Sequence, residues 1–202
     1  MPAGHSGDCH VERPAVPDLI RLVENRTQSD RAALALKLAE REAALARGIE
    51  LIEWTFDPLD AGVADFNFAQ LGVIVHRYEG ETDRFVAEWH LRRPHVERRI
   101  SSAGPVVRDG SVAASPLVNP SREEADGLSP GNADLEVDAR RLLVEVPANF
   151  REMQRSDPSL AAAWRQQTRQ IFQTYLTKGY RVVDFFLSDT SGRGHYLLAI
   201  PA

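Results

Sequence analysis

The sequence predicts an α/β (α+β) fold, and three observations carry this prediction. An amphipathic helical pattern over residues 34–47 is followed by a strand-like run that stops at Asp57-Pro58, and then by a short helical pattern that ends at Gly72. Residues 84–92 alternate apolar and polar side chains, which is typical of a half-buried antiparallel strand. Asp157-Pro158 combines an N-cap residue with proline at the first helical position, which predicts a second long helix. Helix, strand, break, helix and strand, in that order, build a ligand-binding crevice at strand ends.

Composition and charge narrow the functional classes. The 202 residues are 43% hydrophobic and 26% charged, as in a globular protein with one sizeable core. The formal net charge is −5 and no basic stripe is evident, so nucleic acid is not an expected partner. No apolar run is long enough to cross a bilayer, and the first residues lack the pattern of a secretory signal. Cys9 is the single cysteine, which excludes an internal disulfide, so we expect a cytoplasmic protein without a membrane partner.

Caps and helix breakers predict the elements of the first half. Ser29 or Asp30 can cap the long helix, because a short side-chain oxygen accepts from free backbone N–H groups, and Gly48 can end it. Pro58 cannot donate to a strand ladder, so the preceding strand ends there. The expected elements are strands at 49–56, 73–78 and 84–92, a helix at 63–71 and a turn at 79–81.

The same kinds of signal predict the elements of the second half, which follows a segment of different composition. Residues 101–134 are rich in Ser, Gly, Pro and Asp and predict a linker or long loop, with at most a short strand near Val112. Beyond it we expect strands at 142–146, 180–187 and 195–200, a short helix at 150–155, and a long helix from Asp157 to Gly179. The predicted organisation is a flexible lead (1–17), a core half (18–100), the linker (101–134), and a C-terminal α/β half (135–202) that packs on the same core.

A string of residues carries a resemblance to a known family. The run Trp54-Thr55-Phe56-Asp57-Pro58-Leu59 is specific, and Asn67, Leu71-Gly72, Trp164-Arg165 and Thr168-Arg169 follow it in matching order. Together they resemble a bacterial family of predicted acyltransferases of the GNAT superfamily. The resemblance implies a mixed central sheet flanked by helices, with the superfamily's N-terminal strands missing from this chain. It also implies acetyl-CoA or another acyl-CoA as co-substrate, a primary amine such as an amino acid as acceptor, and no metal.

The resemblance also points to a donor site. In the superfamily, a glycine-rich turn before the long helix holds the pyrophosphate of CoA on backbone N–H groups. The matching cofactor-binding positions in this chain are Gln28, Arg31, Ala32 and Ala33. The turn contains no glycine, and Gln28 and Arg31 are the side chains that could compensate for its absence.

Candidate acceptor-site residues come from both halves. Asp57 is a candidate catalytic base at a strand end, or else a carboxylate that caps the following helix. His195 opens the last strand and is the second candidate catalytic residue, ahead of His90 and His95. Arg165 and Arg169 lie four residues apart on one helix and could bind a substrate carboxylate or phosphate.

Some of these residues also have purely structural explanations. The two arginines could instead form ion pairs with Glu145, Glu152 or Asp157. His5, Cys9 and His10 are metal-capable, but no second cluster completes a ligand set, so we expect an uninvolved tail.

These observations lead to one functional expectation and one alternative. We expect an acyl-CoA-dependent N-acyltransferase, in which a neutral amine attacks the thioester carbonyl directly. The alternative is a catalytically silent remnant of the same fold that acts as a binding or oligomerisation module. A homo-oligomer would then supply the missing sheet edge, because an uncovered edge strand is a liability.

Overall fold

The structure is a computed structural model that describes residues 16–101, 112, 114–124, 127–188 and 191–201, with side chains from residue 30 onward. The predicted lead, with His5, Cys9 and His10, lies largely outside these residues. The chain divides into two compact units, Met1–Glu40 and Arg41–Ala202, and the sheet belongs to the second.

The first long helix, α1, spans Val16–Ala46. The prediction that Ser29 or Asp30 caps its N-terminus is wrong, because both lie inside the helix. Residues 18–46 contain neither glycine nor proline, so nothing interrupts the helical hydrogen bonds there. The predicted end is confirmed: Gly48 has a φ of 75° and its N–H donates to the carbonyl of Leu45 at 3.1 Å.

The first half of the sheet has strand, helix, strand and strand in sequence. Asp60 caps the helical part by accepting from the N–H of Val63 at 3.3 Å, and Gly72 ends it with a φ of 70°. The predicted helix at 63–71 is confirmed as two successive helices, of which the second is a π-helix. The elements are β1 (Leu51–Phe56), α2 (Ala61–Asp65), η1 (Phe66–Leu71), β2 (Ile74–Glu79) and β3 (Arg84–His90), followed by α3 (Pro94–Ser101), which the sequence analysis did not predict.

The second half has the same order of elements. Asp157 accepts from the N–H of Leu160 at 3.0 Å, which confirms the predicted N-cap of the long helix. The short strand that was allowed near Val112 falls almost entirely outside the described residues, and Val112 itself is helical; further along, the linker carries a hairpin made of β4 (Arg122–Glu124) and β5 (Gly127–Ser129). The remaining elements are β6 (Arg141–Pro147), α5 (Phe150–Ser156), α6 (Pro158–Thr177), β7 (Arg181–Leu187) and β8 (Arg193–Ala199).

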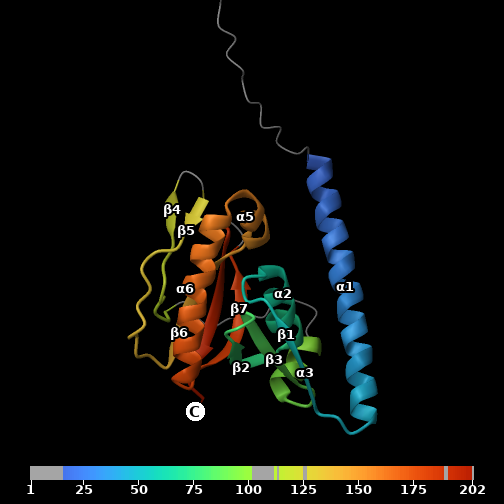
Figure 1. Cartoon of the computed structure of the whole chain (residues 1–202). Helices are drawn as coiled ribbons and strands as arrows, with labels where there is room; N and C mark the ends of the chain where they lie inside the picture. The colour runs from blue at the N-terminus through green and yellow to red at the C-terminus, as the bar shows by residue number, and fades with distance from the viewer. Residues whose placement is uncertain (1–15, 102–111, 113, 125–126, 189–190, 202) are drawn as a thin grey trace, which may run out of the picture. The chain divides into compact units, whose positions relative to one another are not determined.

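Six strands form one sheet in the order β1-β3-β2-β7-β8-β6 (Figure 1). The predicted α+β class is therefore confirmed. Each pairing between neighbouring strands is antiparallel, where the resemblance implied a mixed sheet.

The two halves have equivalent topology. Each consists of a strand, a helical segment and two further strands, and the two halves meet where Val75 of β2 pairs with Val182 of β7. A register shift follows Val75 in β2 and, at the matching place, Val182 in β7. The strands β1 and β6 therefore occupy equivalent positions at the two outer edges of the sheet.

An aromatic core lies between the sheet and the helices on one face. Phe85 of β3 contacts Phe172 of α6 with ring centroids 4.6 Å apart. Tyr196 of β8 contacts Phe172 at 5.4 Å and Phe68 of η1 at 5.8 Å. Because side chains alternate along a strand, Glu88 and His90 of β3 lie on the opposite face from Phe85.

Candidate functional site

The structure brings together two of the predicted site residues, Asp57 and Arg165. The guanidinium of Arg165 donates to both carboxylate oxygens of Asp57, at 2.6 and 2.8 Å, and Asp57 also accepts from the N–H of Leu59 at 2.9 Å. Arg165 thus forms an ion pair, with a partner that the sequence analysis did not name. A fork-to-fork pair of this kind holds α6 against the end of β1.

Arg169 has a similar partner in the first half. Its Nε donates to Asp83 at 2.6 Å, and the hydroxyl of Tyr78 donates to the same carboxylate at 2.6 Å. Hydrogen bonding from Arg169 holds the pKa of Asp83 below its ordinary value, although partial burial opposes this. Burial and the Asp83 carboxylate raise the pKa of Tyr78. Both arginines therefore fasten α6 to acidic residues of the first half.

Asp57 also borders a cavity at the end of β1, where the sequence predicts a crevice. The cavity has a volume of about 380 Å³, and three of its charged side chains form ion pairs, one of them with a residue outside the lining. Asp60 pairs with Arg151, and Asp57 pairs with Arg165. The lining residues are Thr55, Phe56, Asp57, Asp60, Val63, Arg84, Phe150, Arg151 and Gln154.

His195 lies in a separate, mostly buried polar cluster. Its Nε2 is 3.5 Å from Glu145, and its ring stacks on Phe186 with centroids 5.4 Å apart. Glu145 is only 3% exposed; it also accepts from the N–H of Ser121 and lies 3.3 Å from Nε of Arg193. Burial opposes ionisation of Glu145, but these neighbours outweigh it and hold its pKa below the ordinary value. The arrangement is that of a buried, neutralised carboxylate.

The donor-site positions Gln28, Arg31, Ala32 and Ala33 all lie inside α1. Backbone N–H groups in the interior of a helix donate to carbonyls four residues earlier, so they are not free for a pyrophosphate. The structure does not form the turn that the resemblance implies, and the residues present do not fit the phosphates of CoA there.

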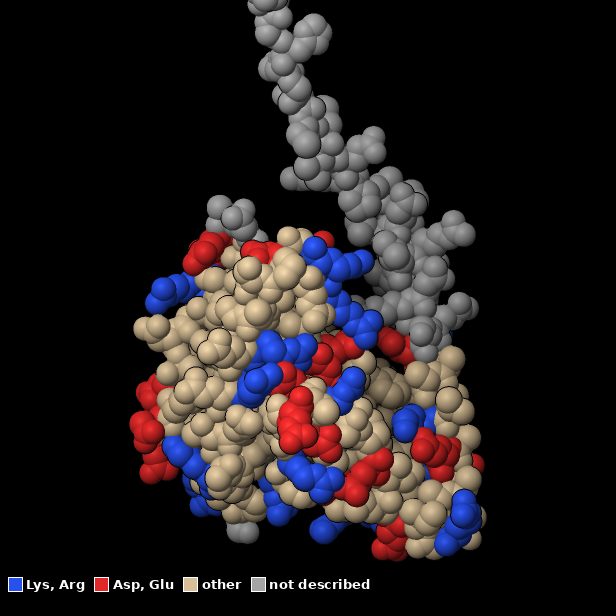
Figure 2. Space-filling model, viewed as in Figure 1, with Lys and Arg blue, Asp and Glu red and all other residues tan. Residues whose placement is uncertain are grey.

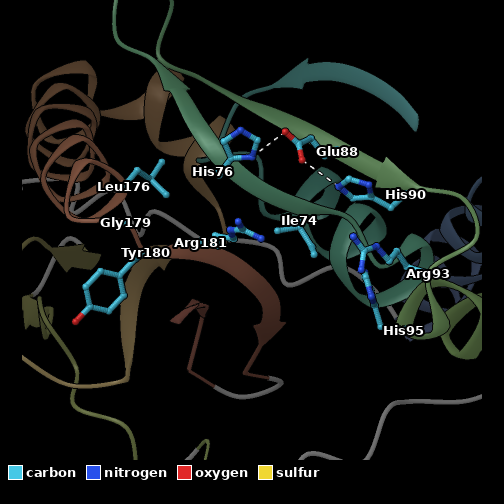
Figure 3. A pocket seen from close by; sticks show the side chains of 10 residues that line it. All are labelled: Ile74, His76, Glu88, His90, Arg93, His95, Leu176, Gly179, Tyr180 and Arg181. Carbon is cyan, nitrogen blue, oxygen red and sulfur yellow. Dashed lines mark hydrogen bonds and ion pairs between the residues drawn. The ribbon is translucent and has the colours of Figure 1, made fainter. Parts of the chain in front are cut away.

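A larger open pocket lies where β2 and β7 meet, and we call it the histidine–arginine pocket (Figure 3). Its volume is about 620 Å³. Side chains come from β2, β3, the start of α3, and the junction of α6 with β7. The lining residues are Ile74, His76, Glu88, His90, Arg93, His95, Leu176, Gly179, Tyr180 and Arg181.

Glu88 holds two imidazoles in this pocket, one on each carboxylate oxygen. His76 Nδ1 lies 2.7 Å from Oε1, and His90 Nε2 lies 3.1 Å from Oε2 (Figure 3). The Glu88 side chain is 12% exposed, whereas those of His76 and His90 are 46% and 31% exposed. A ring N–H donates and a carboxylate oxygen accepts, so each imidazole directs one nitrogen at Glu88 and keeps its other nitrogen for a ligand.

Cationic side chains surround these imidazoles. Arg93 and Arg181 line the pocket, and within the described ranges neither guanidinium has an ion-pair partner. His95 donates from Nε2 to the carbonyl of Gly72 at 3.1 Å, and burial lowers the pKa of this imidazole. Two guanidiniums and one carboxylate line the pocket, so it carries a net positive charge that favours an anionic ligand.

The chemistry available in the pocket is anion binding combined with proton transfer. A histidine oriented by a carboxylate is a common proton acceptor near neutral pH. Within the part of the chain that the structure describes, no group of three or more His, Cys, Asp or Glu side chains could hold a metal ion.

His90 and His95 were candidates from the sequence, but His76 and Glu88 were not identified as site residues. The sequence did contain a signal for them, because residues 73–78 and 84–92 are predicted to be strands joined by a short turn. The polar faces of such a hairpin place His76, Glu88 and His90 on one surface.

No family model matches this chain, and neither does any curated protein or solved structure with which it was compared. Of the helices that the structure describes, none is long and apolar enough to span a membrane. Figure 2 shows a face of the molecule on which acidic and basic side chains lie next to one another.

Proposed function

We propose that this protein binds a small anionic ligand in the histidine–arginine pocket and uses the imidazoles held by Glu88 to move a proton. The observation that carries the proposal is the placement of two imidazoles on the two oxygens of one carboxylate, beside two guanidiniums that have no ion-pair partner among the described residues. The sequence resemblance adds a reaction class to this proposal: transfer of an acyl group from an acyl-CoA to a primary amine, in the cytoplasm.

The pocket supplies the groups that an amine acceptor needs. An amino acid would bind through its carboxylate to Arg93 and Arg181, because guanidinium matches carboxylate geometry. Its neutral amine would attack the thioester carbonyl, and the C–N bond would form as the C–S bond breaks. The nearby imidazole of His76 or His90 would accept the proton that the amine loses and return it to the departing thiolate.

A second candidate, a binding module without catalysis, is favoured by one observation. Residues 28–33 are helical, so the donor turn of the resembled family is not formed. The acyl-CoA would then need another site, or the protein would bind the anion alone.

An assay of thiol release separates the two candidates. The protein is incubated with acetyl-CoA or succinyl-CoA and a panel of amino acids, and free CoA thiol is measured. We expect His76→Ala or His90→Ala to lower kcat by about 100-fold or more, because general-base catalysis contributes that much. Glu53→Gln is the matched control, since Glu53 is an exposed carboxylate on the neighbouring strand, outside the pocket.

Two results would contradict the catalytic part of the proposal. The first is equal kcat for the control and both histidine variants. The second is an absence of thiol release with every donor and acceptor, combined with saturable binding of an anion in the pocket. That second result would identify the protein as a binding module.

A further inference from the structure

The outer edge of β6 is sealed by a segment of the same chain. The N–H of Leu143 donates to the carbonyl of Pro116 at 2.8 Å, and the carbonyl of Leu143 accepts from the N–H of Val118 at 2.9 Å. The side-chain amide of Asn119 then binds both the N–H and the carbonyl of Glu145, at 2.8 and 2.9 Å. The backbone groups of Leu143 and Glu145 that point away from the sheet are therefore satisfied.

The outer edge of β1 is equivalent by topology, but within the described residues no segment forms such hydrogen bonds to it. The carbonyl of Glu50 accepts from the N–H of Leu91, so even-numbered residues of β1 direct their backbone groups toward β3. Leu51, Glu53 and Thr55 consequently direct theirs outward. Among the described residues, no strand pairs with this edge, and β1 pairs with β3 alone.

The correspondence between the two halves also indicates that the backbone groups of Thr55 point outward. Phe56 pairs with Phe85 in the first half, and Val144 pairs with Tyr196 at the matching place in the second. Thr55 therefore corresponds to Leu143, whose backbone groups point outward and are capped. The same groups of Thr55 have no such cap within the described ranges.

We propose that the β1 edge pairs with β1 of a second copy of this chain. The described part of the chain holds no spare strand to fill the edge, because β4 and β5 pair with each other and residues 116–119 lie on β6. Antiparallel pairing of one strand with its own copy satisfies two-fold symmetry, as in isologous dimers. The result is one continuous sheet built from both copies.

The side chains at the edge are compatible with this pairing. If the two-fold axis passes beside Trp54, Glu53 of one copy faces Thr55 of the other, so two glutamates do not oppose each other. Leu51 and Ile49 are 40% and 39% exposed in the single chain, and pairing would remove part of this apolar surface from water. An exposed strand edge with apolar residues is otherwise prone to uncontrolled association.

Sedimentation equilibrium on the full chain tests the proposal. We expect a monomer–dimer equilibrium for the wild type, with slow hydrogen exchange at the amides of Glu53 and Thr55. Glu53→Pro removes an outward N–H that β3 does not use, and Leu51→Glu places a carboxylate opposite Asp57 of the second copy without changing the backbone. Each variant should weaken the dimer by at least tenfold in dissociation constant. Ile200→Glu is the matched control, because Ile200 is equally exposed, at 40%, but lies beyond the end of β8.

Three outcomes would overturn the proposal. One is a wild-type monomer whose β1 edge amides exchange freely. Another is a monomer with these amides protected, which would mean that another part of the same chain covers the edge. The third is a dimer that both edge variants leave unchanged, judged for Leu51→Glu alone if Glu53→Pro does not fold.

Discussion

Two glutamates in this protein each contact histidine, and their surroundings give them different roles. Glu145 is almost completely buried and is neutralised by Arg193 and His195, so it holds structure together. Among the described residues, Glu88 forms ion pairs only with imidazoles, and it lies beside an open pocket whose two guanidiniums have no ion-pair partner there. Neighbouring charge and access to solvent, rather than residue type, decide which carboxylate is available for chemistry.

Replacing Glu145 by glutamine should make stability less sensitive to acid. The folded state holds the pKa of Glu145 below its ordinary value of 4.5, so its ionised form stabilises the fold above that pH. We expect Glu145→Gln to lower the free energy of unfolding by about 2 kcal/mol at neutral pH, because it removes the buried negative charge that Arg193, His195 and the N–H of Ser121 contact. As the pH falls below 4.5 and through the folded pKa, the difference from wild type should shrink.

Urea unfolding over a pH series measures this difference. Glu123→Gln is the control, since Glu123 contacts the same Arg193 but its side chain is 76% exposed. Its effect should stay below about 0.5 kcal/mol at every pH. A gap between Glu145→Gln and wild type that remains constant down to the lowest pH would show that Glu145 is not held in its ionised form by the fold.

At the scale of elements, the C-terminal end of η1 positions His95, which lines the histidine–arginine pocket. Gly72 adopts a φ of 70°, a conformation that favours glycine, and its carbonyl accepts the hydrogen bond from His95. An added Cβ at Gly72 would lie 3.0 Å from Cγ of Arg99, in α3. The close approach of η1 and α3 thus depends on a residue without a side chain.

Gly72→Ala should therefore lower the free energy of unfolding by more than the same substitution does at a glycine that has a similar backbone conformation but open space around it. Gly48 is that comparison, because its φ is 75° and nothing lies within 4 Å of its added Cβ. We expect about 1 kcal/mol for Gly48→Ala, from the backbone alone, and about 2–3 kcal/mol for Gly72→Ala. Thermal and urea unfolding measure both, and equal losses would mean that α3 moves aside at no cost.

Elements marked by local breakers were predictable from sequence. Pro58, Gly72 and Asp157-Pro158 each mark an end or a start that the structure confirms within a few residues. The helix α1 was predicted less well, because Ser29 and Asp30 are good caps locally but lie in a stretch with no residue that interrupts helix formation. α3 was missed because it is short and strongly charged.

At the scale of the whole molecule, tertiary contacts that local patterns do not encode determine the candidate site. Asp57 and Arg165 were both singled out from sequence, but their mutual ion pair across 108 positions was not foreseeable from spacing. Arg181 lines the same pocket as the imidazoles only because β7 of the second half pairs with β2 of the first. The sequence therefore predicted the fold class and most strands, but not which polar residues meet.

Binding of a simple anion tests the central claim most directly. Inorganic phosphate is titrated into the labelled full-length protein, and the NMR signals of the imidazole and guanidinium groups are followed. We predict saturable shifts at His76, His90, Arg93 and Arg181, and a dissociation constant at least about tenfold higher for Arg181→Ala, because one charged hydrogen-bond donor is lost. Arg122→Ala, at an exposed arginine of β4 outside the pocket, should bind phosphate as the wild type does. Equal affinity of Arg181→Ala and Arg122→Ala, or shifts confined to residues outside the pocket, would contradict the account.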